Sequence, residues 1–133
     1  MVLNGRDNGT QHTGPLRIIE GCSDEVGAWL LSRLPDVREL PGGFEAIGIA
    51  RSTGLVGALL YTSWIPCEGG GDVRMWAAGD PGWLSRRVIA HMFGYPFIQL
   101  GCHRMTVLIR RDNAISRKIT EKLGFKLEGV IRE

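Results

Sequence analysis

The stretch DNAISRKITEKLGFKLEG, residues 112–129, carries the signals of a short helix together with its start and its stop. Asp112 or Asn113 can cap the first turn, because both side chains accept hydrogen bonds from free backbone N–H groups. Apolar residues follow at a spacing that turns one helical face towards the core. Gly124 suits the left-handed residue that commonly ends a helix. The stretch therefore predicts a helix whose open end presents Asn113 and Ser116.

Length and composition favour one globular domain. The chain has 133 residues, of which 44% are hydrophobic and 23% are charged. We expect a flexible tail at residues 1–15 and a single domain at residues 16–133, because the first residues are rich in Gly, Asn and Thr. No apolar run approaches the roughly 20 residues of a membrane span, and the first residues lack the apolar core of a signal peptide. The three cysteines lack CxxC spacing, so we expect cytoplasmic thiols and predict no metal site.

Charge is distributed unevenly along the chain. Residues 1–83 carry 6 Lys+Arg and 10 Asp+Glu, a net charge of −4, whereas residues 84–133 carry 10 and 4, a net charge of +6. A solvated basic face is one explanation. The other is an anionic partner, either a phosphate-bearing cofactor or a nucleic acid.

The remaining elements follow from hydrophobic periodicity and turn residues. In chain order we expect a strand at 16–20, a helix capped by Ser23 and closed by Pro35, a hairpin of strands at 44–51 and 55–64, and a strand at 73–78. Next we expect a helix that has Asp80 as its cap and Pro81 as its first residue and that ends before Phe97. A strand at 104–110, the helix described above and a strand at 126–131 complete the order. This order predicts an α+β (α/β) fold, with helices covering a mostly antiparallel sheet.

Two helix starts in this order could bind phosphate, since the first turn of a helix offers unpaired N–H groups. One is at residues 81–86, beside Arg86 and Arg87, and the other is at residues 112–116. Every helix has this property, so the simpler explanations are a capping Asn113 and solvated arginines. No HExxH, GxSxG or Walker motif is present. Glu45, Glu68 and Asp72 are carboxylates near the expected strands, but none is assigned as a general base.

The last forty residues resemble a known family. The pattern N-x-x-S-x-x-x-x-E-K-L-G-F-x-x-E-G, from Asn113 to Gly129, and the preceding YPFIQLGCHRMTVLIRRDN resemble the C-terminal half of GNAT-superfamily N-acetyltransferases. The nearest branch is that of ribosomal-protein N-terminal acetyltransferases, and PGWLSRR is similar to phage and prophage GNAT-like proteins. The resemblance covers about residues 16–132 and is most specific at residues 95–129.

The resemblance implies the GNAT fold, in which the fourth and fifth strands splay apart to hold acetyl-CoA as co-substrate, with helices on both faces of the sheet. It implies that Ser116 points to the thioester sulfur and can act as catalytic acid. It implies the following cofactor-binding residues: Met75, Trp76 and Ala77 beside the pantetheine amides, Gly82, Ser85, Arg86 and Arg87 at the pyrophosphate, and Asn113 and Ser116 along the pantetheine arm.

The sequence also departs from the family pattern. The tyrosine that protonates the leaving thiolate in many members is matched by Thr120, whose hydroxyl is a far weaker acid. The glycine-rich pyrophosphate loop is matched by D-P-G-W, with Trp83 in place of a glycine. We expect the family's seventh strand to be missing, either because the chain is truncated or because a second copy completes the sheet as a homodimer.

The favoured function is an acetyl-CoA-dependent N-acetyltransferase acting on a primary amine, either a small molecule or a protein N-terminus. The alternative is a catalytically inactive GNAT-fold protein that binds CoA or a partner. A basic nucleic-acid-binding module ranks last, because no reading motif or interleaved exposed aromatic residues accompany the basic half. The acceptor cannot be read from the sequence.

Overall fold

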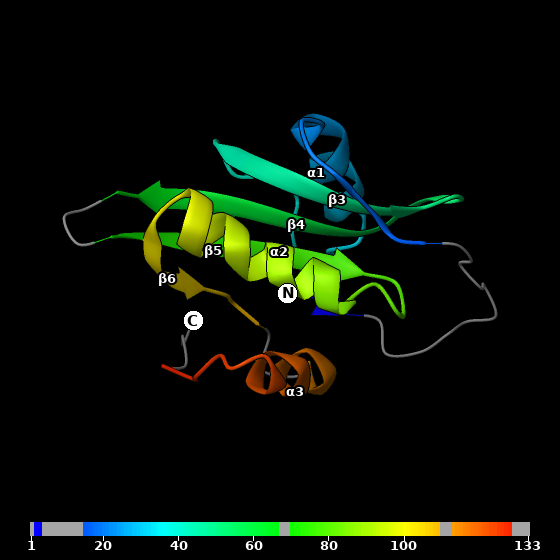
Figure 1. The fold of residues 1–133 in the computed structure, drawn as a ribbon. Helices are drawn as coiled ribbons and strands as arrows, with labels where there is room; N and C mark the ends of the chain where they lie inside the picture. The colour runs from blue at the N-terminus through cyan, green and yellow to red at the C-terminus, as the bar shows by residue number, and fades with distance from the viewer. Residues whose placement is uncertain (1, 4–14, 67–69, 110–112, 129–133) are drawn as a thin grey trace.

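The structure, a computed structural model, describes residues 2–3, 15–66, 70–109 and 113–128 (Figure 1). Its elements are β1 (Val2–Leu3), β2 (Arg17–Ile19), α1 (Ser23–Ser32), β3 (Phe44–Arg51), β4 (Gly54–Ile65), β5 (Gly71–Gly79), α2 (Arg86–Gly94), the π-helix η1 (Tyr95–Gln99), β6 (Cys102–Thr106) and α3 (Ala114–Lys122).

Six strands of the described chain form one mixed sheet. Strands β2, β3, β4 and β5 lie side by side and antiparallel, and both β1 and β6 pair in parallel with the outer edge of β5. Pairing between β5 and β6 ends at Arg74 and Thr106, the last residue of β6, whereas β5 continues to Gly79 without β6 beside it. The predicted α+β class, the mixed and mostly antiparallel sheet and the opening between these two strands are therefore confirmed.

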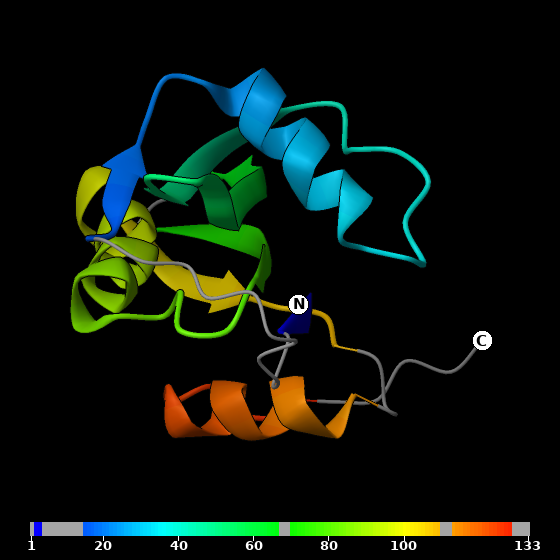
Figure 2. The same ribbon diagram turned by 90° about the vertical axis from the view of Figure 1, so that its right-hand side faces the viewer.

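Helices cover both faces of the sheet (Figure 2). An apolar layer lies beneath the helices on each face. Val26 and Leu30 of α1 pack on one face with the buried residues of β3 and β4 that point that way. Val88 and Met92 of α2 pack on the other face. Alternate residues of the central strands serve the two layers, which explains why these strands read as continuous apolar runs rather than as alternating ones.

The predicted start of α2 is wrong. We expected Asp80 as cap and Pro81 as the first helical residue, but α2 begins at Arg86 and its cap is Ser85, whose Oγ accepts a hydrogen bond from the Val88 N–H at 3.2 Å. Gly82 has φ +85°, a value that no right-handed helix contains, so residues 80–85 form a loop. The predicted end of the regular helix before Phe97 is confirmed, since η1 follows directly.

The predicted helix at the opening stretch is confirmed, including both ends. Asn113 caps α3, because its Oδ1 accepts from the Ser116 N–H at 3.1 Å. At the other end Gly124 has φ +101° and donates its N–H to Glu121 O, and the Phe125 N–H donates to Thr120 O at 3.0 Å. This pair of bonds is the Schellman arrangement, which satisfies carbonyls that the helix itself leaves free.

Three expectations concern the ends of elements and of the chain. The strand expected at 104–110 is shorter and begins earlier, as β6. Residues 126–128 of the expected last strand are not in a strand, and 129–131 lie outside the described residues. Of the residues expected as a tail, Val2 and Leu3 form β1, and 4–14 lie outside the described residues. No described helix has both the length and the apolar character that a membrane crossing needs.

Candidate functional site

The outer edge of β5 is open over three residues. On its inner edge the strand pairs with β4 throughout this region, with Met75 opposite Tyr61. On its outer edge β6 pairs as far as Arg74, and β1 pairs with Ala78 and Gly79. Among the described residues, 75–77 therefore have no strand partner on that edge. These are the Met75, Trp76 and Ala77 that the family resemblance placed beside the pantetheine amides.

β1 lies between β5 and α3 (Figure 2). Its register pairs Val2 with Ala78 and Leu3 with Gly79. The edge that continues from the open segment towards α2 is thus covered by a strand from the start of the chain. Sequence reasoning missed this strand, because two residues in a polar stretch give no strand signal.

The start of α2 stands just beyond the end of β5. The first helical hydrogen bond runs from the Ile89 N–H to Ser85 O at 2.9 Å, and Ser85 Oγ takes the N–H of Val88. The N–H groups of Arg86 and Arg87 belong to the first turn, where a helix supplies no partner of its own. Both arginine side chains are exposed, and Arg87 Nη1 reaches Leu16 O at 3.5 Å. The predicted phosphate-binding residues are therefore together, but in a helix start shifted to Arg86.

Trp83 does not project outwards from this loop. Its side chain is 3% exposed and belongs to the apolar layer beneath α2. The indole of Trp83 thus occupies the interior of the protein and not the outer surface of the loop.

At the start of α3, the side chains of Asn113 and Thr120 form hydrogen bonds to the backbone of the helix itself. Ser116 is fully buried at 0% exposure and Thr120 is 4% exposed. The Thr120 hydroxyl donates to Ser116 O or Arg117 O, each at 2.9 Å. A hydroxyl held by carbonyls of the preceding turn is a common structural use of threonine within a helix. Asn113 and Ser116 share this end of α3, and Asn113 holds the capping bond described above.

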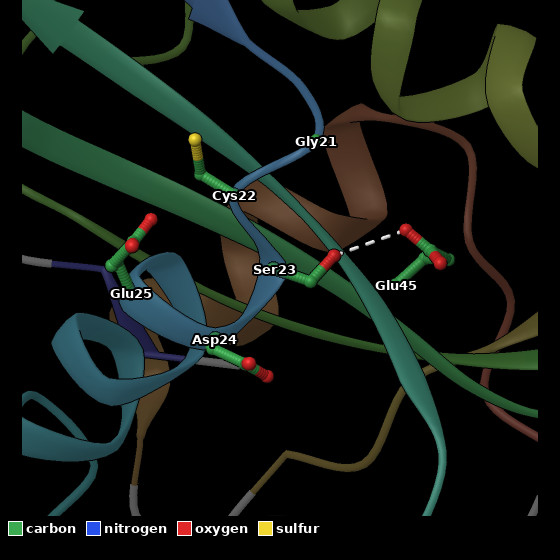
Figure 3. Close-up of a pocket in the computed structure, with 6 residues that line it drawn as sticks. All are labelled: Gly21, Cys22, Ser23, Asp24, Glu25 and Glu45. Carbon is green, nitrogen blue, oxygen red and sulfur yellow. Dashed lines mark hydrogen bonds between the residues drawn. The ribbon is translucent and has the colours of Figure 1, made fainter.

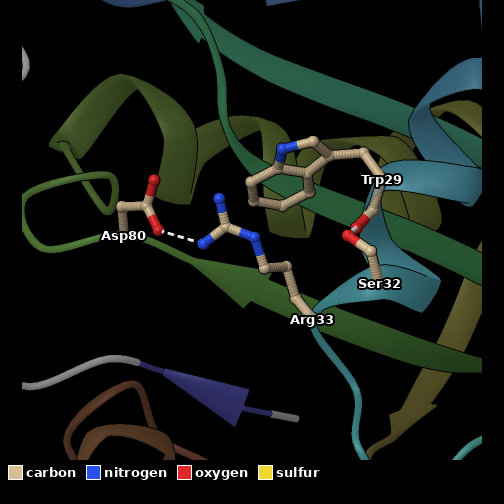
Figure 4. Close-up of polar contacts among 4 residues, drawn as sticks. All are labelled: Trp29, Ser32, Arg33 and Asp80. Carbon is tan, nitrogen blue, oxygen red and sulfur yellow. Dashed lines mark hydrogen bonds and ion pairs between the residues drawn. The ribbon is translucent and has the colours of Figure 1, made fainter.

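Asp80 is part of an ion pair that sequence reasoning missed (Figure 4). Its Oδ1 lies 2.5 Å from Arg33 Nη1, at the end of α1, and its side chain is only 11% exposed. The Arg33 guanidinium also lies over the Trp29 ring, with 4.5 Å from Cζ to the ring centroid. The pair joins α1 to the first residue of the loop before α2. No local signal could have found it, because the partners are 47 residues apart.

The carboxylates considered as bases have other surroundings. Asp72 and Glu128 both pair with Arg104 of β6, and the pair with Glu128 ties the segment after α3 to the sheet. Asp72 Oδ1 is buried without a hydrogen-bond partner. Glu68 lies outside the described residues.

Glu45 lines a pocket of about 330 Å³ at the start of α1, with Gly21, Cys22, Ser23, Asp24 and Glu25 (Figure 3). Ser23 does not cap α1 as expected. Its Oγ instead donates to Glu45 and accepts the Ala46 N–H, both at 3.0 Å. The hydrogen bond from Cys22 to Glu25, and the negative charge of that residue, raise the pKa of the thiol. This acidic pocket is at the β2–β3 side of the sheet, opposite the open edge of β5, and its charge is unsuited to phosphate.

The tyrosines of β4 and η1 have raised pKa values. Burial raises the pKa of Tyr61, whose hydroxyl donates to Met92 O at 2.7 Å. Burial, and then the charge of Glu45, raise the pKa of Tyr95 on η1. Within the described ranges, no three His, Cys, Asp or Glu side chains gather as a metal site would require.

The sequence matches no protein-family model and no curated protein. Solved structures do match the fold. The aminoglycoside N-acetyltransferase AAC(6')-Iy in complex with CoA is 17% identical, with a TM-score of 0.64 over 90% of this chain and 92% of that chain. An acetyltransferase of Trypanosoma brucei is 18% identical, with a TM-score of 0.60 over 90% and 96%. A transcriptional regulator from Bacillus halodurans C-125 is 15% identical, with a TM-score of 0.65 over 90% and 98%. The mixed sheet, the opening beside β5 and these similarities together show that the chain has the GNAT fold.

Proposed function

We propose that the protein is an acetyl-CoA-dependent N-acetyltransferase that acts on a primary amine. The observation that carries the proposal is the open edge of β5 at residues 75–77, followed along the chain by the β1-paired residues 78 and 79, the loop at 80–85 and the start of α2. An extended ligand with amide groups at one end and phosphates at the other fits such an edge followed by a helix start. The CoA complex of AAC(6')-Iy, a protein of the same fold, supports this choice of ligand.

The residues of the chain divide the work as follows. The backbone of Met75, Trp76 and Ala77 hydrogen-bonds the pantetheine amides, as an added strand would. The first turn of α2 and the exposed side chains of Arg86 and Arg87 bind the pyrophosphate, with charge-assisted hydrogen bonds. Gly82 and Ser85 shape the loop that leads to this turn.

Acetyl-CoA supplies the acetyl group as a thioester. In the transfer the amine nitrogen gains the acetyl group and loses a proton to water, while the CoA sulfur leaves and gains a proton. Ser116 is the proton donor in this proposal, and Asn113 beside it orients the pantetheine arm. Thr120 has no part in the chemistry, because its hydroxyl is already directed at the carbonyls of the preceding turn.

A second function, CoA binding without transfer, is favoured by one specific observation. The position of the family's acidic tyrosine holds a threonine with a structural role, and the neighbouring Ser116 is fully buried. A protein with this site could keep the cofactor and lack an efficient proton donor. Tight CoA binding with no turnover of acetyl-CoA would identify it.

The test is release of free CoA thiol from acetyl-CoA in the presence of a panel of amines and of peptides with free N-termini. We expect release that depends on both protein and amine, with acetylated product found by mass spectrometry. Arg87→Ala should weaken the donor's apparent affinity, whereas Arg38→Ala is a matched control, because Arg38 is exposed in the connection between α1 and β3. Transfer that is unchanged in Arg87→Ala would contradict the assigned phosphate site.

A further inference from the structure

The Trp83 side chain lies over two glycines that are opposite each other on adjacent strands. Gly57 of β4 and Gly79 of β5 are register partners. A methyl group added at Gly79 would lie 2.2 Å from the indole Cδ2, and one added at Gly57 would lie 2.3 Å from the indole Cε3. Both distances are far inside van der Waals contact. The indole therefore occupies a space that exists only because both partners lack a side chain.

This contact fixes the loop that connects β5 to α2. The Asp80 N–H donates to Val56 O at 2.7 Å, the Trp83 N–H donates to Asp80 O at 3.2 Å, and the Ser85 N–H donates to Trp83 O at 3.1 Å. Gly82, at φ +85°, reverses the chain between them. Trp83 is fully enclosed in the apolar layer under α2, and Leu84 packs partly buried against the same layer, so the indole ring holds the loop against the sheet.

We propose that Trp83, placed on Gly57 and Gly79, is a positioning residue for the phosphate-bearing end of the cofactor. It determines where α2 begins and hence where the N–H groups of Arg86 and Arg87 stand relative to the end of β5. The inference rests on the proposed function, in which those groups bind the pyrophosphate. It also explains how a loop with tryptophan in place of a glycine can hold phosphate. The ring is directed inwards, and a rigid loop positions the phosphate-binding N–H groups without the close approach of loop backbone to phosphate that a glycine would allow.

The experiment compares two ligands that share the pantetheine arm. CoA carries the pyrophosphate and nucleotide, and pantetheine lacks them. Binding of each is followed by nuclear magnetic resonance through the backbone amides of residues 75–77, in the wild-type protein and in Trp83→Leu. Trp64→Leu serves as the control, because Trp64 is 48% exposed near the far end of β4.

We expect Trp83→Leu to raise the Kd for CoA by about tenfold or more, because displaced backbone donors lose charge-assisted hydrogen bonds. The Kd for pantetheine should stay within about twofold, since its partners on β5 do not depend on the loop. Trp83→Phe, which keeps a ring on the two glycines, should restore most of the CoA affinity and provides the comparison if the leucine variant does not fold.

Equal weakening of both ligands in Trp83→Leu, or in Trp83→Phe where that variant is the one that folds, would show a general structural role and overturn the inference. Unchanged CoA affinity in both variants would overturn it as well. Failure of the proposed function looks different, because the wild-type protein would then bind neither CoA nor pantetheine.

Discussion

The ion pair between Arg33 and Asp80 predicts a measurable coupling between α1 and the loop before α2. Local sequence suggests Asp80 as a helix cap, whereas in the structure Ser85 is the cap and Asp80 pairs with Arg33. The two roles differ in what a second substitution does. If Asp80 acted as a cap, its replacement would lower the free energy of unfolding by the same amount with or without Arg33. If Asp80 acts as an ion-pair partner, its replacement costs less once Arg33 has been removed.

The magnitude follows from exposure and geometry. The Asp80 side chain is 11% exposed and that of Arg33 is 38% exposed, with 2.5 Å between Oδ1 and Nη1. A hydrogen bond between charged groups is worth about 1.5–3 kcal/mol, and partial solvent access to the arginine lowers this to about 1–2 kcal/mol. Arg33→Ala also loses the contact with the Trp29 ring, worth about 0.5–1 kcal/mol at an exposed site. The single change should therefore cost about 1.5–3 kcal/mol in all.

The assay is urea unfolding of Arg33→Ala, Asp80→Ala and the double variant, analysed as a double-mutant cycle. We expect a coupling free energy of about 1–2 kcal/mol. Asp80→Ser, which keeps a capping hydroxyl, should be nearly as destabilised as Asp80→Ala. Arg38→Ala, at an exposed position nearby, should change stability by less than about 0.5 kcal/mol. A coupling free energy below about 0.5 kcal/mol, together with wild-type stability in Asp80→Ser, would refute the ion-pair reasoning.

Three further changes follow from the packing of the loop, α3 and β1. Gly79→Ala should lower the free energy of unfolding by about 1–3 kcal/mol, because the added methyl group would clash with Trp83. Gly94→Ala, in α2 with nothing within 4 Å of the added methyl group, should be neutral or stabilising. Equal effects of the two changes in thermal unfolding would contradict this prediction. Thr120→Val should retain stability within about 1 kcal/mol and full transfer activity, while a specific loss of activity in a folded Thr120→Val would show a chemical role for the hydroxyl. Deletion of residues 2–14 should tighten CoA binding in calorimetry, because β1 pairs with the β5 edge that the cofactor must follow, and unchanged or weaker binding would show that β1 does not compete.

Local signals predicted α3 almost completely from the sequence. Asn113, Gly124 and the apolar spacing between them each act within a few residues, so their effect does not depend on the rest of the fold. The same holds for the β3–β4 hairpin, where two apolar runs flank a short turn containing Gly54. The resemblance in this C-terminal part also led to the correct opening beside β5.

The start of α2 could not be predicted in the same way. The Asp80–Pro81 pair is a good local signal for a helix start, but tertiary contacts take precedence. Asp80 forms an ion pair with Arg33, and the Trp83 side chain packs over Gly57 and Gly79. With these two residues held in the loop, the helix begins only after Ser85. Each of these contacts joins residues that are far apart in sequence or on neighbouring strands.

The roles of individual site residues depend on what lies opposite them. From sequence, Thr120 was compared with a catalytic tyrosine, and only the structure shows its hydroxyl directed at two carbonyls of its own helix. β1 likewise forms only through its pairing with β5, which is far away in sequence, and two residues alone carry no signal that predicts a strand.

The most direct test of the central claim is calorimetric titration of acetyl-CoA into the purified protein, with CoA as a parallel titration. We predict saturable binding with a stoichiometry of one and a Kd in the micromolar range, of the order of −8 kcal/mol in binding free energy. Absence of saturable heat with both ligands, confirmed by unchanged backbone amide shifts at residues 75–77, would contradict the assignment of the β5 edge as a cofactor site.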